Sequence, residues 1–184
     1  MEVDDTDLGH MRTALQQAKE AFDAGEVPIG AVVVCGGDVV AAAGNAVERS
    51  HDASAHAEVL AMRAAAQRSG NWRLTGCTLY ATLEPCAMCL SAAYLFRVDR
   101  IVYGASDVRM GGAGGWVDLT PPAVRHPFHA ALAVTGGVLA PQSVALLRGF
   151  FQQQRRRAPG SAAAPSAAAP AATPVHGGDA QGGS

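Results

Sequence analysis

One histidine and two cysteines of this chain have the types and the spacing of ligands for a single zinc ion. Cys86 and Cys89 stand three residues apart, 30 residues after His56. Zinc prefers thiolate and imidazole ligands and is normally four-coordinate, so three protein ligands leave one position open for water, as in catalytic sites. Zinc lowers the pKa of such a water towards ~7 and makes hydroxide available at neutral pH. The sequence therefore predicts a hydrolytic centre with one zinc ion per chain.

Glu58, two residues after His56, is placed to carry protons in this chemistry. A carboxylate beside the metal takes the proton of the zinc-bound water, delivers it to a ring nitrogen and later protonates the leaving amine. With Pro85 the residues spell H-x-E…P-C-x-x-C, the signature of zinc-dependent nucleobase deaminases. We therefore expect Glu58 to be the catalytic proton shuttle.

Two other interpretations of the C-x-x-C pair are open. It could be a redox pair in a thioredoxin-like fold, but this leaves His56 and Glu58 unexplained. A structural zinc would need a fourth ligand, for which Cys35 and Cys77 are the candidates; both lie in apolar, strand-like runs and are more simply explained as buried core thiols. We therefore expect no disulfide framework, a reducing compartment and a cytoplasmic protein.

Two helix N-termini are expected to converge on the metal. The apolar spacing after His56 predicts a helix that stops near Gly70. The apolar stretch 78–83 predicts a buried strand, and Pro85 suits the first turn of a following helix, which carries both cysteines on one face. The positive end of that helix dipole helps to keep the first cysteine a thiolate.

The remaining elements indicate an α/β fold. Helical or alternating apolar patterns and glycine turns mark them. The order α-β-β-α-β-α-β predicts a mixed sheet flanked by helices. The additional expected elements are an amphipathic helix over 8–22, a hairpin over 31–41, a strand over 100–104 and a last helix over 141–157 with Phe150 and Phe151 towards the core.

Composition limits the domain organisation and the partners. The 184 residues suffice for one domain with an ample core. From residue 158 the chain is Ala, Pro, Gly and Ser with almost no bulky apolar residue, so we expect a zinc-dependent domain over 1–157 and a disordered tail over 158–184. The formal net charge of −2 means that any nucleic-acid surface must be a local patch. No apolar run approaches the ~20 residues of a membrane span, so we expect no membrane partner.

Over about residues 11–157 the chain resembles the bacterial-type tRNA-specific adenosine deaminases of the cytidine deaminase superfamily. This resemblance implies a cytidine deaminase-like three-layer α-β-α fold, a homodimer and a tRNA partner. It also implies zinc-dependent hydrolysis of the wobble adenosine (A34) of an anticodon loop to inosine. The segments that carry it are 26–33, 44–45, 55–58, 82–89, 102–107 and 146–151.

The resemblance also assigns substrate contacts. Asn45 matches the asparagine that hydrogen-bonds the flipped base, although an asparagine after Gly44 is also typical of a turn. Asp107 matches a loop aspartate that lies near the substrate ribose in the family. A carboxylate there can accept a hydrogen bond from the 2′-hydroxyl and so favour RNA over DNA. The alternative is that Asp107 is an ordinary solvated turn residue. The other expected substrate-binding residues, in the pocket wall and at the C-terminus, are Val27, Pro28, Ile29, Leu83 and Phe151.

Two segments depart from the family's pattern. Residues 152–154 are glutamines where many members have basic residues, and the charge arrives later, at 155–157. The proline-rich stretch 120–130 resembles plastid-type relatives, so a plastid protein stays open as the alternative to a cytoplasmic one. Its His126 and His129 have ligand-like spacing but are better explained as surface or substrate-edge residues. These departures concern tRNA docking and leave the deamination chemistry intact.

Two competing functions share parts of this sequence. An enzyme acting on a free base or nucleoside, such as guanine or cytosine, would use every zinc residue. A non-catalytic scaffold subunit would be expected to lack the glutamate, and Glu58 is present. Asp107 and the C-terminal Phe pair with its basic helix favour RNA as the substrate.

Overall fold

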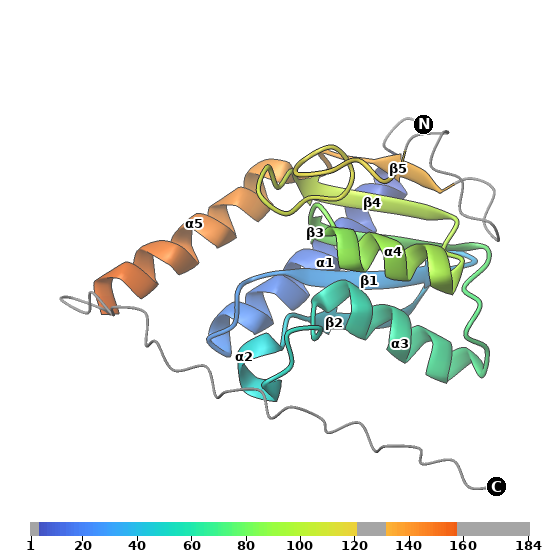
Figure 1. Ribbon diagram of the computed structural model, residues 1–184, viewed down its shortest axis with the longest axis horizontal. Helices are drawn as coiled ribbons and strands as arrows, with labels where there is room; N and C mark the ends of the chain where they lie inside the picture. The colour runs from blue at the N-terminus through green and yellow to red at the C-terminus, as the bar shows by residue number, and fades with distance from the viewer. Residues whose placement is uncertain (1–3, 121–131, 158–184) are drawn as a thin grey trace, which may run out of the picture.

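The computed structural model describes residues 4–120 and 132–157. Figure 1 shows a central sheet with helices on both faces. The expected tail over 158–184 and the two histidines at 126 and 129 lie outside the described residues. The described elements are α1 (Asp5–Asp23), β1 (Gly30–Cys35), β2 (Asp38–Gly44), α2 (Val47–Ser50), α3 (Ala57–Ser69), β3 (Cys77–Leu83), α4 (Ala87–Phe96), β4 (Arg100–Ala105), β5 (Ala133–Thr135) and α5 (Ala140–Arg157).

The sheet is mixed, as the sequence predicted. Its strand order is β2-β1-β3-β4-β5. β1 pairs antiparallel with both β2 and β3, whereas β3, β4 and β5 run parallel to one another. Parallel neighbours need a crossover, and α4 supplies it between β3 and β4. The short helix α2 and the edge strand β5 were not anticipated from the sequence.

Alternating side chains of the strands build a separate core on each face of the sheet. Val33, Leu79 and Ile101 pack with α3 and α4 on one face. Val32 and Val102, the neighbours of residues 33 and 101, pack with α1 on the other. This period of two is the normal geometry of a strand, and it confirms the three-layer α-β-α architecture (Figure 1).

Cys35 and Cys77 form a disulfide, which corrects the expectation of two separate core thiols. They lie directly opposite each other in the antiparallel β1–β3 ladder, with their Cα atoms 4.3 Å apart. The strand assignment of both residues was right. The pairing depends on which strands become neighbours, and the local apolar pattern does not contain that information. The disulfide also removes both cysteines as candidates for a fourth zinc ligand.

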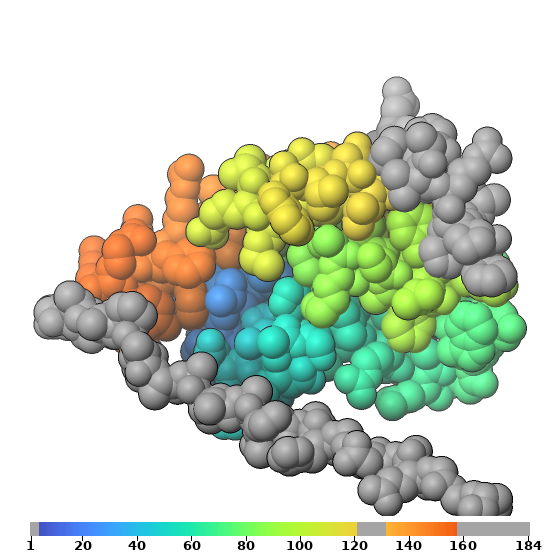
Figure 2. All heavy atoms as spheres, viewed as in Figure 1, coloured from blue at the N-terminus to red at the C-terminus, as the bar shows by residue number. Residues whose placement is uncertain are grey.

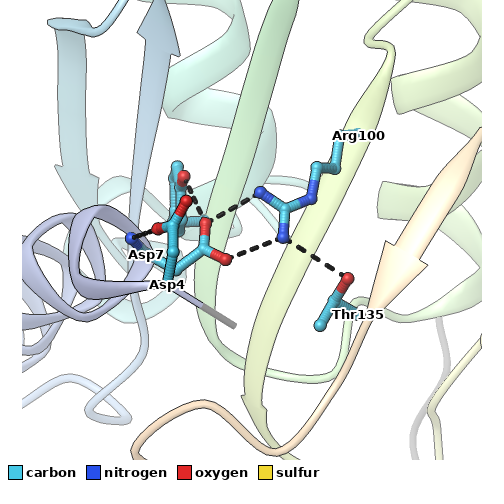
Figure 3. Close-up of polar contacts among 5 residues, drawn as sticks. Asp4, Asp7, Arg100 and Thr135 are labelled. Atoms are coloured by element: carbon cyan, nitrogen blue, oxygen red, sulfur yellow. Dashed lines mark hydrogen bonds and ion pairs between the residues drawn. The ribbon is translucent and has the colours of Figure 1, made fainter. Parts of the chain in front are cut away.

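A buried ion pair ties α1 to the sheet, as Figure 3 shows. Asp7 is 1% exposed and accepts hydrogen bonds from both terminal nitrogens of Arg100 at 2.8 Å. The Tyr80 hydroxyl donates to the same carboxylate at 2.8 Å, and Asp4 caps the helix by accepting from the Asp7 N–H. Burial alone raises the pKa of Asp7, but the hydrogen bonds from Arg100 and Tyr80 and the Arg100 charge outweigh it and lower that pKa.

None of the described helices combines the length and the apolar character that crossing a membrane requires.

Candidate active site and zinc centre

The side chains of His56, Cys86 and Cys89 meet at one point, as the sequence predicted. The two sulfurs lie 3.6 Å apart, and they lie 3.6 and 3.4 Å from Nδ1 of the histidine. A tetrahedral zinc ion, with Zn–S near ~2.3 Å and Zn–N near ~2.0–2.1 Å, separates such ligands by about 3.5–3.8 Å. The donor set and its spacing therefore fit one zinc ion with an open fourth position.

Helix starts place these ligands. His56 is the N-cap of α3, and Cys86 is the N-cap of α4, with Cys89 in the first turn. The expected convergence of two helix N-termini is thus confirmed. Pro85, however, precedes α4 and does not occupy its first turn, because the helical backbone begins only at Ala87.

The contact between the two cysteine sulfurs shifts the pKa values of the two thiols in opposite directions. Their hydrogen bond is the largest influence on the pKa of Cys86, which falls to about 4, and it raises the pKa of Cys89. The contact with His56 lowers the pKa of Cys86 further. A zinc ion binds both sulfurs as thiolates, so binding would release the proton of any cysteine that is still a thiol.

Glu58 is the second residue of α3, two positions after the ligand His56, and is 3% exposed. Burial raises its pKa above the ordinary value for a glutamate. Its Oε2 atom has no hydrogen-bond partner among the described residues. A carboxylate that is buried, without a partner for one oxygen and easily protonated has the properties of a proton shuttle.

A pocket of about 800 Å³ opens beside the zinc ligands, and His56 contributes to its wall. Figure 2 shows the surface hollowed between α5, in orange, and the yellow-green loop that follows β4. Pro28 is buried and is absent from the lining, so its expected place in the wall is not seen. The other expected substrate residues all line the pocket: Val27, Ile29, Asn45, Leu83, Asp107 and Phe151.

Asn45 is held inside this pocket and is not an exposed turn residue. It is 4% exposed, and its Nδ2 donates to Oε2 of Glu26 at 3.4 Å. Glu26 is 1% exposed and also accepts the backbone N–H groups of Glu48 and Arg49. A carboxylate only accepts hydrogen bonds, so it turns the NH₂ of Asn45 towards itself. Glu26 lies in one of the segments that carry the family resemblance, but no role was anticipated for it.

The last helix, α5, presents two different faces. Phe150 is buried, with its ring edge-on to Phe22, whereas Phe151 is 39% exposed and lines the pocket. The expectation that both aromatic rings pack into the core was wrong, because consecutive helical residues point about 100° apart. The basic residues Arg148 and Arg155 line the same pocket. Arg155 belongs to the basic helix end that was expected to favour RNA, whereas no role was anticipated for Arg148.

Comparisons with known proteins agree with this site. A family model of the cytidine and deoxycytidylate deaminase zinc-binding region matches residues 4–105. The tRNA-specific adenosine deaminase of Bacillus subtilis (strain 168) is 40% identical over 148 residues, which are 80% of this chain and 90% of that protein. The chloroplastic tRNA(adenine(34)) deaminase of Arabidopsis thaliana is 39% identical over 155 residues, but the match spans only 12% of its length.

A solved structure is similar as well. It comes from work on A-to-I editing by tRNA:A34 deaminases at the wobble position of transfer RNA, and it is 37% identical with a TM-score of 0.68. The match covers 76% of this chain and 99% of that one. The chain therefore belongs to the zinc-binding cytidine and deoxycytidylate deaminase family, in its branch of bacterial-type tRNA-specific adenosine deaminases.

Proposed function

We propose that this protein hydrolyses the wobble adenosine (A34) of a tRNA anticodon loop to inosine. The observation that carries the proposal is one continuous pocket that joins a zinc ligand, His56, to an aromatic and basic helix face. A base at the zinc end would leave the other end for the neighbouring nucleotides. There Phe151 offers a stacking surface and Arg148 and Arg155 offer charge for phosphates.

The chain's own residues have distinct tasks in this reaction. The histidine and the two cysteines would hold a zinc ion, which would make a hydroxide nucleophile available at neutral pH. Glu58 takes one proton from the attacking water and passes it to N1 of adenine as the C6–O bond forms. It then moves the second proton of that water, from the new 6-hydroxyl, to the 6-amino group, so the C6–N bond breaks and adenosine and water become inosine and ammonia. Asn45, oriented by Glu26, holds the edge of the base. Extrusion of a loop base also requires little free energy, because the base is not paired.

Asp107 is the proposed reader of the sugar. It is half-buried at the pocket rim, and its Oδ1 accepts the N–H of Arg109 at 3.0 Å, so the carboxylate keeps acceptor capacity for a 2′-hydroxyl.

A homodimer, which the resemblance implies, and a cytoplasmic location, with the plastid as the alternative, are further proposals. The disulfide between Cys35 and Cys77 removes the cysteine-based support for a reducing compartment, because disulfides are rare in the cytosol. Light scattering of the purified chain tests the dimer, and fractionation of the source cells tests the location.

The function is tested with the purified, zinc-loaded chain and an anticodon stem-loop that carries adenosine at the wobble position. Inosine, detected by mass spectrometry, is the expected product. Guanine, cytosine and free adenosine are tested as substrates in parallel reactions. Turnover of a free base without any inosine in the stem-loop would identify a free-base deaminase instead. Inactivity on every substrate, with zinc bound, would favour the scaffold subunit.

A further inference from the structure

A second buried carboxylate lies beside the zinc centre and takes no part in the chemistry above. Glu84 is 3% exposed and stands two residues before Cys86. Its Oε2 accepts the backbone N–H of Asp107 at 2.9 Å. Its Oε1 accepts the N–H groups of Ala113 at 2.9 Å and Gly115 at 3.0 Å. Three backbone donors of one loop thus converge on a single side chain.

The loop is wound closely around this carboxylate. A Cβ atom on Gly111 would collide with the Glu84 carboxyl group, and one on Gly115 would collide with the Asp107 carbonyl. The loop is also joined to the backbone of the zinc-binding segment, because Gly112 donates to the Pro85 carbonyl at 2.8 Å. The glycines therefore permit an approach that any other residue would block.

The outer side of the same loop forms one wall of the substrate pocket. Residues 105–110 all line it. Val108 is 79% exposed and Met110 is 55% exposed, so neither side chain anchors the loop in a core. With little apolar burial over 106–110, the position of this wall depends on the hydrogen bonds that the loop makes on its inner side.

We propose that Glu84 is a positioning residue that locks this loop to the zinc-binding segment and so sets where Asp107 meets the substrate. All three partners of Glu84 are donors, and a carboxylate, which only accepts, is suited to satisfy them together. The role rests on the proposed function for the identity of the substrate. The locking of the loop itself rests on the geometry alone.

The test is Glu84→Gln in the full, zinc-loaded chain. An amide in this place directs its NH₂ group at one or more of the three N–H donors, so the loop should loosen. We expect one zinc per chain as in wild type, a KM for the anticodon stem-loop raised about tenfold or more with a smaller change in kcat, and faster amide hydrogen exchange at residues 107, 113 and 115.

Three further variants separate positioning from general destabilisation. Asp118→Asn changes an exposed carboxylate just beyond the loop, which accepts a hydrogen bond from the backbone N–H of Thr120. This variant should have the same KM and the same amide hydrogen exchange as wild type. Asp7→Asn breaks the buried ion pair on the opposite face of the sheet; it should lower Tm without raising KM. Glu84→Asp keeps the charge with a shorter reach, and it should fall between wild type and Glu84→Gln.

Several outcomes would overturn this role. The first is that KM and the amide hydrogen exchange of the loop are unchanged in Glu84→Gln. The second is that this variant loses zinc in parallel with activity. The third is that KM rises equally in Asp7→Asn. If Glu84→Gln fails to fold, the same measurements on Glu84→Asp decide. If wild type makes no inosine, the proposed function fails, and hydrogen exchange still decides whether Glu84 holds the loop.

Discussion

Cys86 and Cys89 belong to the same helix end but differ in burial. Cys89 is fully buried, whereas Cys86 is half-buried. With three protein ligands, the loss of either sulfur leaves too few to hold zinc tightly. We expect Cys86→Ala and Cys89→Ala each to lose the metal, as measured by elemental analysis of the purified protein. Full zinc occupancy in either variant would show that its sulfur is not a ligand.

Removal of Glu58 should separate chemistry from metal binding. Glu58 is buried in the first turn of α3 but is not one of the three ligands. We therefore expect Glu58→Ala to keep its fold and one zinc and to lose about 10²–10⁴-fold in turnover, the usual contribution of general acid–base catalysis. Circular dichroism and metal analysis provide the controls. A rate within about tenfold of wild type would exclude the shuttle role.

Asp107 should affect the choice of sugar more than the chemistry of the base. Asparagine keeps the size of the side chain but weakens its acceptance of the ribose 2′-hydroxyl. We expect Asp107→Asn to lower the ratio of the deamination rate on an RNA stem-loop to that on the same DNA sequence. Asn45→Ala is the contrasting variant, because a group that holds the base should impair turnover of both. An unchanged ratio in Asp107→Asn would remove the sugar-reading role.

At the scale of elements, α5 carries both packing and charge, and the two can be separated. Phe150 and Phe22 hold the helix to the core, whereas residues 155–157 add three arginines to its last turn. If this turn binds phosphates, changing the three arginines to Gln should weaken stem-loop binding. The slope of log affinity against log salt should also fall, by about 0.7–0.9 for each phosphate that the variant no longer neutralises.

A matched control for α5 lies on and just after α3. Arg63, Arg68 and Arg73 are exposed and do not line the pocket, so their change to Gln removes the same charge from another site. The same decrease of affinity and slope in both triple variants would indicate a general charge effect. No decrease in either would mean that the end of α5 is solvated and takes no part in docking.

At the scale of the whole molecule, the Asp7–Arg100 pair links the first helix to the sheet across 93 residues of sequence. The pKa of Asp7 is lowered in the folded state, so its contribution to stability is present above the unfolded pKa of about 3.9 and is lost as pH falls through the lower, folded value. Removal of one partner of a buried pair typically costs about 3–5 kcal/mol.

We therefore expect Asp7→Asn to unfold more easily at pH 7, and the difference from wild type to shrink at the acidic end of a pH series. Urea unfolding followed by circular dichroism measures both. Asp38→Asn, which changes an exposed carboxylate at the turn between β1 and β2, is the control and should follow wild type. A difference that does not change with pH would show that the ionisation of Asp7 contributes nothing to stability.

The zinc ligands were predictable from the residues themselves because their signal is local, whereas most of the expected pocket wall came from the family resemblance. The shuttle role of Glu58 stays a prediction. Zinc chemistry limits the residue types, and the helix starts at His56 and Cys86 follow from turn residues and apolar spacing close by. The mixed sheet with flanking helices was predictable for the same reason, since each element shows its own periodicity, and the family resemblance implied the three-layer arrangement.

Strand order, register and burial were decided only by the tertiary structure. The Cys35–Cys77 disulfide exists because β1 and β3 became antiparallel neighbours. Glu26 and Glu84 look like ordinary surface residues in the sequence, yet each is buried where distant backbone N–H groups converge on it. A residue's type and its immediate neighbours limit what chemistry it can do. Contacts between segments far apart in the chain determine whether it is buried, paired or exposed, and local sequence patterns carry no record of those contacts.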